Sequence, residues 1–389
     1  MWNKLKLLFN PSTADEIKKL NFFDPTKKTI LVIDENLPQH DKSSGSKRIF
    51  ELTKIFKSMG LNVIFFPADG LQISPYDQLL KELEIDLVIN EKKQMLKTLQ
   101  SLLKYIDYAW ISRPMLNKSF QKIVKKNKKT KIIFDTVDLH YIRLLRQSEN
   151  EKDEKLYRRA LKFKKLELRL AKNANATITV TELEQQILEN EKINHVFTIP
   201  NIHELHQAPK EISYEERHGI LFIGGYKHEP NIDAVKWLIN EIMPIVWRKL
   251  ENVPVYLLGS YPTDEVLNLS SSLVVVPGYL NDVSDFFYSS RVFVAPLRYG
   301  AGMKGKIGQS LEFSLPIVTT TIGAEGMNLI HGENVIIADD VKEFAHQIIE
   351  LYENQQLWGK IKSNAANSIL NYSAEKVKLQ LTNLFISLN

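Results

Sequence analysis

Residues 291–320 read RVFVAPLRYGAGMKGKIGQSLEFSLPIVTT and contain one complete strand–helix–strand unit. The runs RVFVAP (291–296) and PIVTT (316–320) are short, apolar and rich in β-branched residues, which is typical of buried strands. Between them we expect a helix from about Lys304 to Ser314. Two strands joined through a helix are the repeating unit of a parallel sheet. The stretch therefore predicts an α/β fold.

The same alternation extends along the chain in both directions from this unit. Continuous apolar strands separated by amphipathic segments indicate a parallel sheet with helices on both faces. Before residue 199 we predict the strands TILVID (29–34), NVIFF (62–66), DLVI (86–89), YAWIS (108–112), KIIFD (131–135) and ATITV (176–180). After residue 218 we predict GILFIG (219–224), a helix near 231–249, VYLLG (255–259), LVVVPG (273–278), RVFVAP, PIVTT, NVIIAD (334–339) and two closing helical stretches.

The length of the chain and a break in this pattern predict two domains. A chain of 389 residues is too long for one ordinary core. The segment IPNIHELHQAPKEISYEERHG (199–219) has two prolines and no clear strand, so we interpret it as a linker. The predicted fold is α/β, with two tandem Rossmann-like, doubly wound parallel-sheet domains and a cleft between them. The predicted parts are an N-terminal extension (1–28), two domains (29–205 and 206–372) and a C-terminal helix (373–389) with the option of packing back on the N-terminal domain.

Composition limits the class of protein. Hydrophobic residues make up 44% and charged residues 25% of the chain, as in ordinary globular proteins. Cysteine is absent, which excludes disulfides and thiolate chemistry and favours a cytoplasmic location. The net charge is +5, with lysine-rich clusters at 118–131 and 155–172. These clusters fit either a solvated helix face or attraction to an anionic membrane or acidic acceptor, whereas no nucleic-acid-binding pattern is clear.

The first ten residues, MWNKLKLLFN, are a poor signal peptide because Lys4 and Lys6 interrupt a short apolar run. They fit either a helix packed on the body of the protein or a helix lying on a membrane surface, with one side formed by Trp2, Leu5, Leu8 and Phe9. No apolar run approaches the roughly 20 residues that span a bilayer. We therefore expect a cytoplasmic protein, with peripheral contact at the inner face of the cell membrane as an additional option.

Ligands of doubly wound sheets bind beyond the carboxyl ends of the strands, so the loops after strands are candidate sites. In LRYGAGMKGK (297–306), glycines leave the backbone open and a helix start adds partial positive charge. Basic side chains add full charges, and a Walker loop does not fit. This composition predicts a diphosphate cradle, with a solvated surface turn as the alternative. Its members are Gly300, Gly302, Gly305, Arg298, Lys304, Lys306 and, for a ribose hydroxyl, Gln309.

Two further loops offer open backbone. In DENLPQHDKSSGSKR (34–48), the residues around Gly45 can bring N–H groups to an anion at a helix start. In FIGGYKHEPNIDAVKWL (222–238), Gly224 and Gly225 follow a strand, and Asn231 is a candidate helix cap. Simple strand-to-helix turns explain both loops about as well. The first loop lacks the dinucleotide fingerprint Gly-x-Gly-x-x-Gly, which weighs against a nicotinamide or flavin enzyme.

The segment IIFDTVDLHYIRLLR (132–146) gathers Asp135, Asp138, His140 and Arg143 where a strand gives way to a helix. A histidine beside a carboxylate can be held in one tautomer and act as a base or orient a hydroxyl. A capping aspartate with a structural histidine is the alternative. One histidine and two aspartates at such a junction are weak metal ligands, so no metal site is predicted.

The second domain, from GILFIGGYKHEPNIDAVKWLINEIMPIV through VVVPGYLNDVSDFFYSSRVFVAPLRYGAGMKGKIGQSLEFSLPIVTTTIGAEGMNL, resembles glycosyltransferase family 4, retaining enzymes of the GT-B fold. The first domain resembles the family in DKSSGSKRIFELTKIFKSMGLNV and IIFDTVDLHYIRLLR. The similarity covers nearly everything from residue 29 to 380, and PLRYGAGMKGKIGQS is its most specific element.

The resemblance implies sugar transfer in the cleft, with a nucleotide-sugar bound mainly to the second domain and the acceptor mainly to the first. The implied setting is bacterial, and the implied acceptor is a polysaccharide, a lipid-linked glycan or a protein glycan. A metal or other cofactor is not expected, and neither is a nucleic-acid partner.

The resemblance places Lys304 and Lys306 at the donor diphosphate, Tyr279 and Leu280 at the base, and Gly45 opposite the phosphates. Together with the residues selected from the loops, the predicted donor-binding residues are Gly45, Gly224, Gly225, Tyr279, Leu280, Arg298, Gly302, Lys304, Lys306, Gln309 and Glu312. The predicted catalytic residues are His140, Asp138 and Lys304, and the acceptor-side residues are Asp138, His140 and Arg143. Two places depart from the family. Gln309 stands where many members have a ribose-binding glutamate, and Gly225, Tyr226 and Lys227 stand where many have arginine and lysine.

Two other functions fit the same pattern. A GT-B-type sugar-nucleotide epimerase would use the same cradle without an acceptor. A non-catalytic scaffold that binds a nucleotide-sugar would fit the glutamine at position 309.

Overall fold

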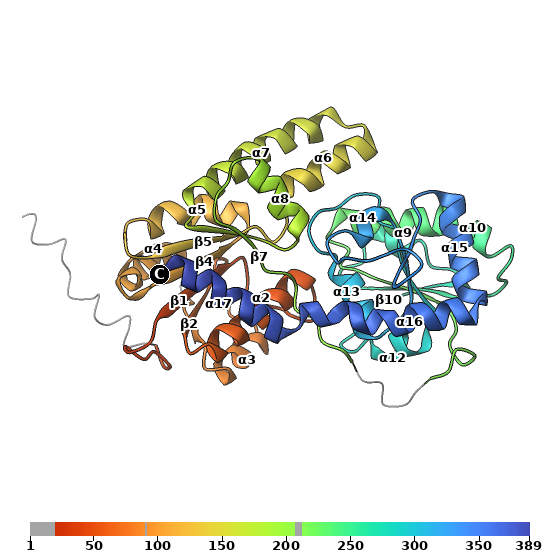
Figure 1. Cartoon of the computed structure of the whole chain (residues 1–389), viewed down its shortest axis with the longest axis horizontal. Helices are drawn as coiled ribbons and strands as arrows, with labels where there is room; N and C mark the ends of the chain where they lie inside the picture. The colour runs from red at the N-terminus through yellow and green to blue at the C-terminus, as the bar shows by residue number, and fades with distance from the viewer. Residues whose placement is uncertain (1–19, 90–91, 207–211) are drawn as a thin grey trace, which may run out of the picture.

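Two α/β domains lie side by side in the computed structural model, which describes residues 20–89, 92–206 and 212–389 (Figure 1). The segment with Trp2, Leu5, Leu8 and Phe9 lies outside these residues. Within the described ranges the strands form a seven-stranded and a six-stranded sheet, and their recorded pairings are parallel. Within the same ranges, no helix combines the length and the apolar character that a membrane span requires. The predicted fold class is confirmed.

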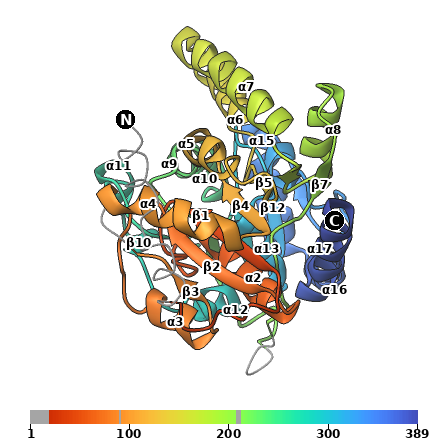
Figure 2. The same ribbon diagram turned by 90° about the vertical axis from the view of Figure 1, so that its left-hand side faces the viewer.

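The first sheet has the strand order β3-β2-β1-β4-β5-β6-β7. Its strands are β1 (Thr29–Asp34), β2 (Asn62–Pro67), β3 (Asp86–Leu87), β4 (Tyr108–Ser112), β5 (Lys131–Asp135), β6 (Ala176–Thr179) and β7 (Val196–Thr198). Its helices are α2 (Ser44–Ser58), α3 (Tyr76–Glu82), α4 (Lys92–Leu102), the turn η3 (Leu103–Tyr105), α5 (Pro114–Val124), α6 (His140–Glu151), α7 (Glu154–Asn173) and α8 (Glu182–Asn190). Helices α6 and α7 form a hairpin that projects from the sheet (Figures 1 and 2).

Successive residues of β1 explain why helices cover both faces of this sheet. Ile30 and Val32 share one core with Phe56 of α2, whereas Leu31 and Ile33 belong to the core on the other face. All four strand residues are fully buried. A parallel strand between two helical layers is therefore apolar along its whole length, which is the pattern seen in the sequence.

The second sheet has the strand order β10-β9-β8-β11-β12-β13. Its strands are β8 (Ile220–Ile223), β9 (Val255–Leu258), β10 (Val274–Gly278), β11 (Val292–Ala295), β12 (Ile317–Thr319) and β13 (Ile336–Ile337). The other elements are α9 (Glu229–Trp237), the π-helical segment η4 (Leu238–Ile242), α10 (Met243–Val246), α11 (Asp264–Leu267), α12 (Ser284–Ser289), α13 (Gly305–Glu312), α14 (Thr321–Ala324), α15 (Val341–Glu353), α16 (Gln355–Ile369), the turn η5 (Leu370–Tyr372) and α17 (Ala374–Leu388).

Three helices, and not the expected two, follow the last strand. Asn354 ends α15, and its side chain accepts a hydrogen bond from the backbone of Leu357, so a new helix begins there. The helix expected near 231–249 is interrupted by the π-helical segment η4. Strand β7 is an addition to the prediction, because three residues are too few to form a recognisable strand pattern.

Helix α17 leaves the second domain and packs on the first (Figure 1). The ring of Phe385 lies 6.1 Å from that of Phe56 and 4.7 Å from that of Tyr108. The chain therefore crosses between the domains twice, once after β7 and once at η5. The two crossings are joined where the His203 amide donates to the carbonyl oxygen of Tyr372 at 2.9 Å.

Candidate active site

Each sheet has a point where the strand order reverses. It lies between β1 and β4 in the first sheet and between β8 and β11 in the second. Ligands of doubly wound sheets bind beyond the strand ends at such points. Three of the four candidate loops predicted from the sequence follow β1, β8 and β11. These loops therefore lie at the two reversal points.

The first turns of α2 and α13 adjoin across the domain boundary. Ser43 caps α2, and its Oγ accepts from the Ser46 amide at 3.2 Å. A side chain on Gly305, the first residue of α13, would overlap the Cβ of Ser44. The first turn of a helix has N–H groups without intrahelical partners and carries partial positive charge. Two such turns, one from each domain, therefore lie together at the boundary.

Gly224 and Gly225 let other groups approach the loop after β8. A Cβ on Gly225 would lie 3.4 Å from the Ser260 Oγ and 3.8 Å from the carbonyl oxygen of Lys42 in the first domain. The Ser260 hydroxyl donates to that same carbonyl at 3.4 Å. A Cβ on Gly224 would lie only 2.8 Å from the Nζ of Lys306. Close approach therefore favours glycine at position 224, whereas a Cβ at position 225 would make ordinary van der Waals contacts.

Lys306 is held inside the second domain by one hydrogen bond and one aromatic ring. Its Nζ donates to the Asn231 Oδ1 at 2.7 Å and lies 3.9 Å from the centroid of the Phe222 ring. Burial lowers the pKa of Lys306 well below its usual value. Asn231 does not cap a helix as expected, because α9 begins earlier, at Glu229, and the Asn231 amide instead donates to the Gly225 carbonyl at 2.8 Å.

Lys304 precedes α13 and is paired with a carboxylate. Its Nζ donates to the Gly302 carbonyl at 2.8 Å and lies 3.2 Å from the Glu325 Oε2. Arg146 from the first domain donates to both oxygens of Glu325, at 2.8 and 2.7 Å. Burial lowers the pKa of Lys304, although Glu325 opposes this shift. The Glu325 carboxylate thus joins a cation from each domain.

Arg298 is directed to α9. Its guanidinium donates to both carboxylate oxygens of Asp233, at 3.0 Å from Nε, and lies 5.6 Å from the centroid of the Trp237 ring. The charge of Arg298 is therefore already matched by an aspartate.

Tyr279 reaches the first domain. Its hydroxyl donates to the Asp41 carboxylate, and the Lys42 Nζ lies 5.7 Å from the centroid of its ring. Asp41 also accepts from the Tyr76 hydroxyl at 2.8 Å. Leu280, the next residue, is half-buried against the core of the second domain. Of this predicted pair, the tyrosine lies at the domain boundary and the leucine contributes to packing.

The structure brings Asp138, His140 and Arg143 together at the start of α6. The His140 Nε2 lies 3.1 Å from one Asp138 oxygen, and the Arg143 Nε lies 3.3 Å from the other. Burial alone would raise the pKa of Asp138, but Arg143 and His140 outweigh it and hold this pKa far below its usual value. A Cβ on Gly302 would lie 3.0 Å from the Asp138 Cβ, so this cluster adjoins the predicted cradle.

Two buried glutamates fix the backbone of this cluster. Glu184 accepts from the Leu139 amide at 2.9 Å, and Glu167 accepts from the amides of His140 and Tyr141 at 2.9 and 3.0 Å. Burial raises the pKa of Glu167 to about 8 and that of Glu184 to about 7. The start of α6 is therefore positioned by carboxyl groups from α7 and α8.

Glu312 joins the two domains. It is buried, accepts from the Lys47 Nζ at 2.8 Å and lies 2.7 Å from the His203 Nδ1. Burial would raise the pKa of Glu312, but His203 and Lys47 lower it below its usual value. No hydrogen bond of the Gln309 side chain, one turn earlier in α13, is recorded within the described part of the chain.

Four other residues of the cleft were not among the predicted ones: Arg113, Arg146, His228 and Glu325. Arg113 directly follows β4, so the rule that selected the other loops would also have found it. Arg146 and Glu325 are 179 residues apart in sequence, and nothing in either segment indicates the pairing. His228 lies 3.4 Å from the Arg143 Nη1, again across the domain boundary.

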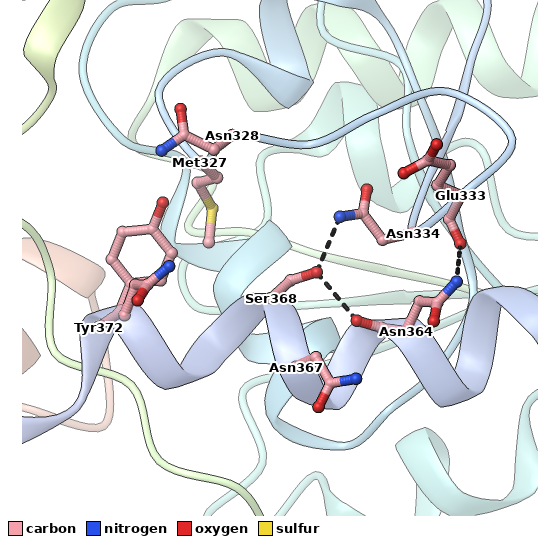
Figure 3. Close-up of a pocket in the computed structure, with 9 residues that line it drawn as sticks. Met327, Asn328, Glu333, Asn334, Asn364, Asn367, Ser368 and Tyr372 are labelled. Atoms are coloured by element: carbon pink, nitrogen blue, oxygen red, sulfur yellow. Dashed lines mark hydrogen bonds between the residues drawn. The ribbon is translucent and has the colours of Figure 1, made fainter.

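A separate pocket of about 290 Å³ lies on the second domain, between the segment 327–334 and α16 (Figure 3). The Asn334 amide donates to the Ser368 hydroxyl at 2.8 Å, and the Asn364 amide donates to the Glu333 carbonyl at 2.8 Å. None of the predicted site residues lines this pocket, whose lining is rich in asparagine carboxamides.

Residues 217–354 match the family described as Glycosyl transferases group 1. The chain is also 27% identical over 168 residues to an "Uncharacterized 44.6 kDa protein in cps region" of Klebsiella pneumoniae. The aligned region covers 41% of this chain and 43% of that protein. The match thus spans less than half of that relative. The family match supports the resemblance to glycosyltransferases that the sequence predicts for the second half of the chain.

Solved structures with the same architecture cover most of the chain. Anabaena Alr3699/HepE in complex with UDP and glucose is 15% identical, with a TM-score of 0.69 over 92% of this chain and 100% of that one. Sucrose-phosphate synthase from Thermosynechococcus elongatus is 12% identical, with a TM-score of 0.70 over 93% and 99%. A mutant of S. aureus TarM, in complex with Fondaparinux, alpha-GlcNAc-glycerol and UDP, is 14% identical, with a TM-score of 0.70 over 92% and 99%. These likenesses confirm the predicted GT-B fold.

Proposed function

We propose that the protein transfers a sugar from a nucleotide-sugar to a glycan or lipid-linked acceptor, with retention of anomeric configuration. The observation that carries this proposal is the meeting of the α2 and α13 first turns at the two reversal points, beside Lys306 and Gly45. The group 1 match supports glycosyl transfer. The UDP and glucose bound to the Anabaena structure support a nucleotide-sugar donor.

The charges of the cleft suit this reaction. Breaking the bond between the sugar and the diphosphate places negative charge on the leaving group. Preorganised N–H groups and cations stabilise such charge, and loss of one donor typically lowers turnover about a hundred- to a thousandfold. Lys304 and Lys306 flank the first residue of α13, so both are candidates to contact the diphosphate.

The cluster at the start of α6 is the candidate acceptor side. Asp138 stays ionised, because its pKa lies far below neutral pH, and its carboxylate orients the His140 ring. With retention of configuration, the departing phosphate accepts the proton of the acceptor hydroxyl on the same face of the sugar. His140 then positions the acceptor or the sugar, and Arg143 is the candidate partner of an anionic acceptor.

Protein cations take the place that a divalent metal occupies in other transferases. The basis is the donor set: lysines, arginines and helix starts gather at the cleft. Within residues 20–89, 92–206 and 212–389, no group of three or more histidines and carboxylates is arranged to hold a metal ion. We therefore propose turnover that is independent of a metal.

The cellular setting is part of the same proposal. The relative from a cps region supports a role in polysaccharide assembly. The exposed basic side chains of α7, which include Lys155, Lys162 and Lys165, are candidate contacts for the inner face of a membrane. The proposed location is cytoplasmic and peripheral to that membrane.

The proposal is tested by incubating the protein with a panel of nucleotide-sugars and glycan acceptors while release of the nucleoside diphosphate is measured. We expect acceptor-dependent release that EDTA leaves unchanged. Binding of a nucleotide-sugar without release under every condition would contradict transfer and favour a scaffold. Conversion to a second nucleotide-sugar without an acceptor would favour an epimerase, and full inhibition by EDTA, reversed by a metal, would contradict metal independence.

A further inference from the structure

Arg113 is a cation at the edge of the cleft that the proposed mechanism has not used. It directly follows β4, and β4 pairs with β1 at the point where the strand order of the first sheet reverses. Side chains at this position face the space in which doubly wound sheets bind ligands.

The guanidinium of Arg113 is held along one edge. Its Nε lies 3.2 Å from the Asp34 Oδ1 and 3.6 Å from the Glu35 Oε2. A guanidinium has five N–H donors, and within the described residues no hydrogen bond is recorded from Nη1 or Nη2 of Arg113. The side chain is 24% exposed. Asp34 therefore orients the group, and its outer edge is open.

The open edge lies beside the first turn of α2. A Cβ on Gly45 would lie 3.4 Å from the Arg113 Nη2, and the neighbouring Ser44 adjoins Gly305 of α13. The guanidinium thus lies next to the place where the two helix starts meet. Glycine at position 45 lets the guanidinium approach the backbone at this helix start.

The other cations of the cleft have partners. Lys304 is paired with Glu325, Arg298 with Asp233, and Lys306 donates to Asn231. Of Gly225, Tyr226 and Lys227, which follow the first strand of the second domain, only the lysine is a cation, and its Nζ lies 3.7 Å from the centroid of the Tyr261 ring. A cation from the first domain would add to the positive charge available to a diphosphate.

We propose that Arg113 binds the diphosphate of the donor from the first-domain side, through its two Nη groups. This inference rests on the proposed function and deepens it, because it makes the first domain a direct ligand of the leaving group. A planar guanidinium suits the task, since it can serve a carboxylate along one edge and phosphate oxygens along another. Closure of the two domains then completes the anion site.

The backbone conformation of Arg113 is unfavourable for a residue with a side chain. Its φ of 62° and ψ of 149° lie in a region that is populated almost only by glycine. Glycine would therefore suit the backbone better at this position, yet arginine occupies it.

The test measures binding by titration calorimetry with UDP, GDP and ADP, and with UMP, GMP and AMP as the matched monophosphates. The variants are Arg113→Gln and Arg113→Lys, and the control is Arg158→Gln, an exposed arginine paired with Glu154 of its own helix. For the best-bound diphosphate, we expect Arg113→Gln to raise the Kd about ten- to a hundredfold, the size of a lost charge-assisted contact. Arg113→Lys is expected to recover part of the loss, and the control is expected to bind as tightly as the wild type.

The ratio of the monophosphate Kd to the diphosphate Kd distinguishes loss of the Arg113–diphosphate contact from non-specific disruption of the binding site. We expect this ratio to fall toward one in Arg113→Gln, because the lost contact belongs to the diphosphate. The double variant Asp34→Asn/Arg113→Gln removes the buried carboxylate that the single variant leaves unpaired, and it should show the same loss with a native thermal midpoint. Unchanged diphosphate affinity in either folded variant overturns the inference. A wild-type protein that binds none of the diphosphates overturns the proposed function itself.

Discussion

Lys306 combines a buried amino group with a position beside the proposed diphosphate. Burial disfavours its charged form and lowers its pKa well below the usual value. An anion placed next to it raises this pKa again. We therefore predict that binding of a nucleoside diphosphate is accompanied by uptake of a proton. Calorimetric titration at one pH, in two buffers with different heats of ionisation, measures the number of protons taken up.

The control for this prediction replaces a lysine far from the proposed diphosphate site. Lys306→Met should reduce the proton uptake and weaken binding, whereas Lys162→Met, on the exposed face of α7, should change neither. Equal uptake in the wild type and in Lys306→Met would show that Lys306 does not meet the diphosphate.

Single residues also show how far the sequence could predict the site. Gly45, Gly224 and Lys306 lie in the segments that follow strands, where the topology of a doubly wound sheet places ligands, so local sequence was enough to select them. The partners of the selected cations could not be found in this way. Asp233 and Glu325 are acidic residues without a local pattern, and only the tertiary structure brings them to Arg298 and Lys304.

Among the elements, α13 has a distinct role at each end. Its first turn adjoins α2 at the proposed anion site, and Glu312 near its end is tied to Lys47 and His203. The folded-state pKa of Glu312 lies below the ordinary value of 4.5. Its contribution to stability is therefore fully present above about pH 4.5 and is lost as the pH falls through the lower folded-state value.

We predict that Glu312→Gln removes this pH-dependent contribution. The free energy of unfolding of the wild type should exceed that of the variant by a margin that shrinks as the pH falls below about 4.5. Denaturant unfolding at several pH values measures the margin. Glu375→Gln, an exposed glutamate in the first turn of α17, should give a much smaller margin, because only the helix start stabilises its charge. A margin for Glu312→Gln that stays constant with pH would argue against the charged link between α13 and α2.

For the whole molecule, the alternating pattern predicts the strands well because each one is buried on both faces. Every predicted strand is present, with ends that differ from the expected ones by at most two residues. The pattern says less about the path of the chain after β13. The break between α15 and α16 depends on the cap at Asn354. The position of α17 depends on its packing against core residues more than 250 positions earlier in the sequence, such as Tyr108, which contacts Phe385 (385 − 108 = 277).

Helix α17 joins the two domains, because it follows the second domain in the chain and packs on the core of the first. Phe385 is 7% exposed and packs on Phe56 and Tyr108, whereas its neighbour Ile386 is 68% exposed. Phe385→Ala should lower the free energy of unfolding by about 3–5 kcal/mol, the usual cost of emptying an aromatic core position. Ile386→Ala should change it by less than about 0.5 kcal/mol. Denaturant unfolding of both variants measures the difference. Because the helix reaches this core only by crossing back from the second domain, equal effects of the two substitutions would mean that α17 does not join the domains in solution.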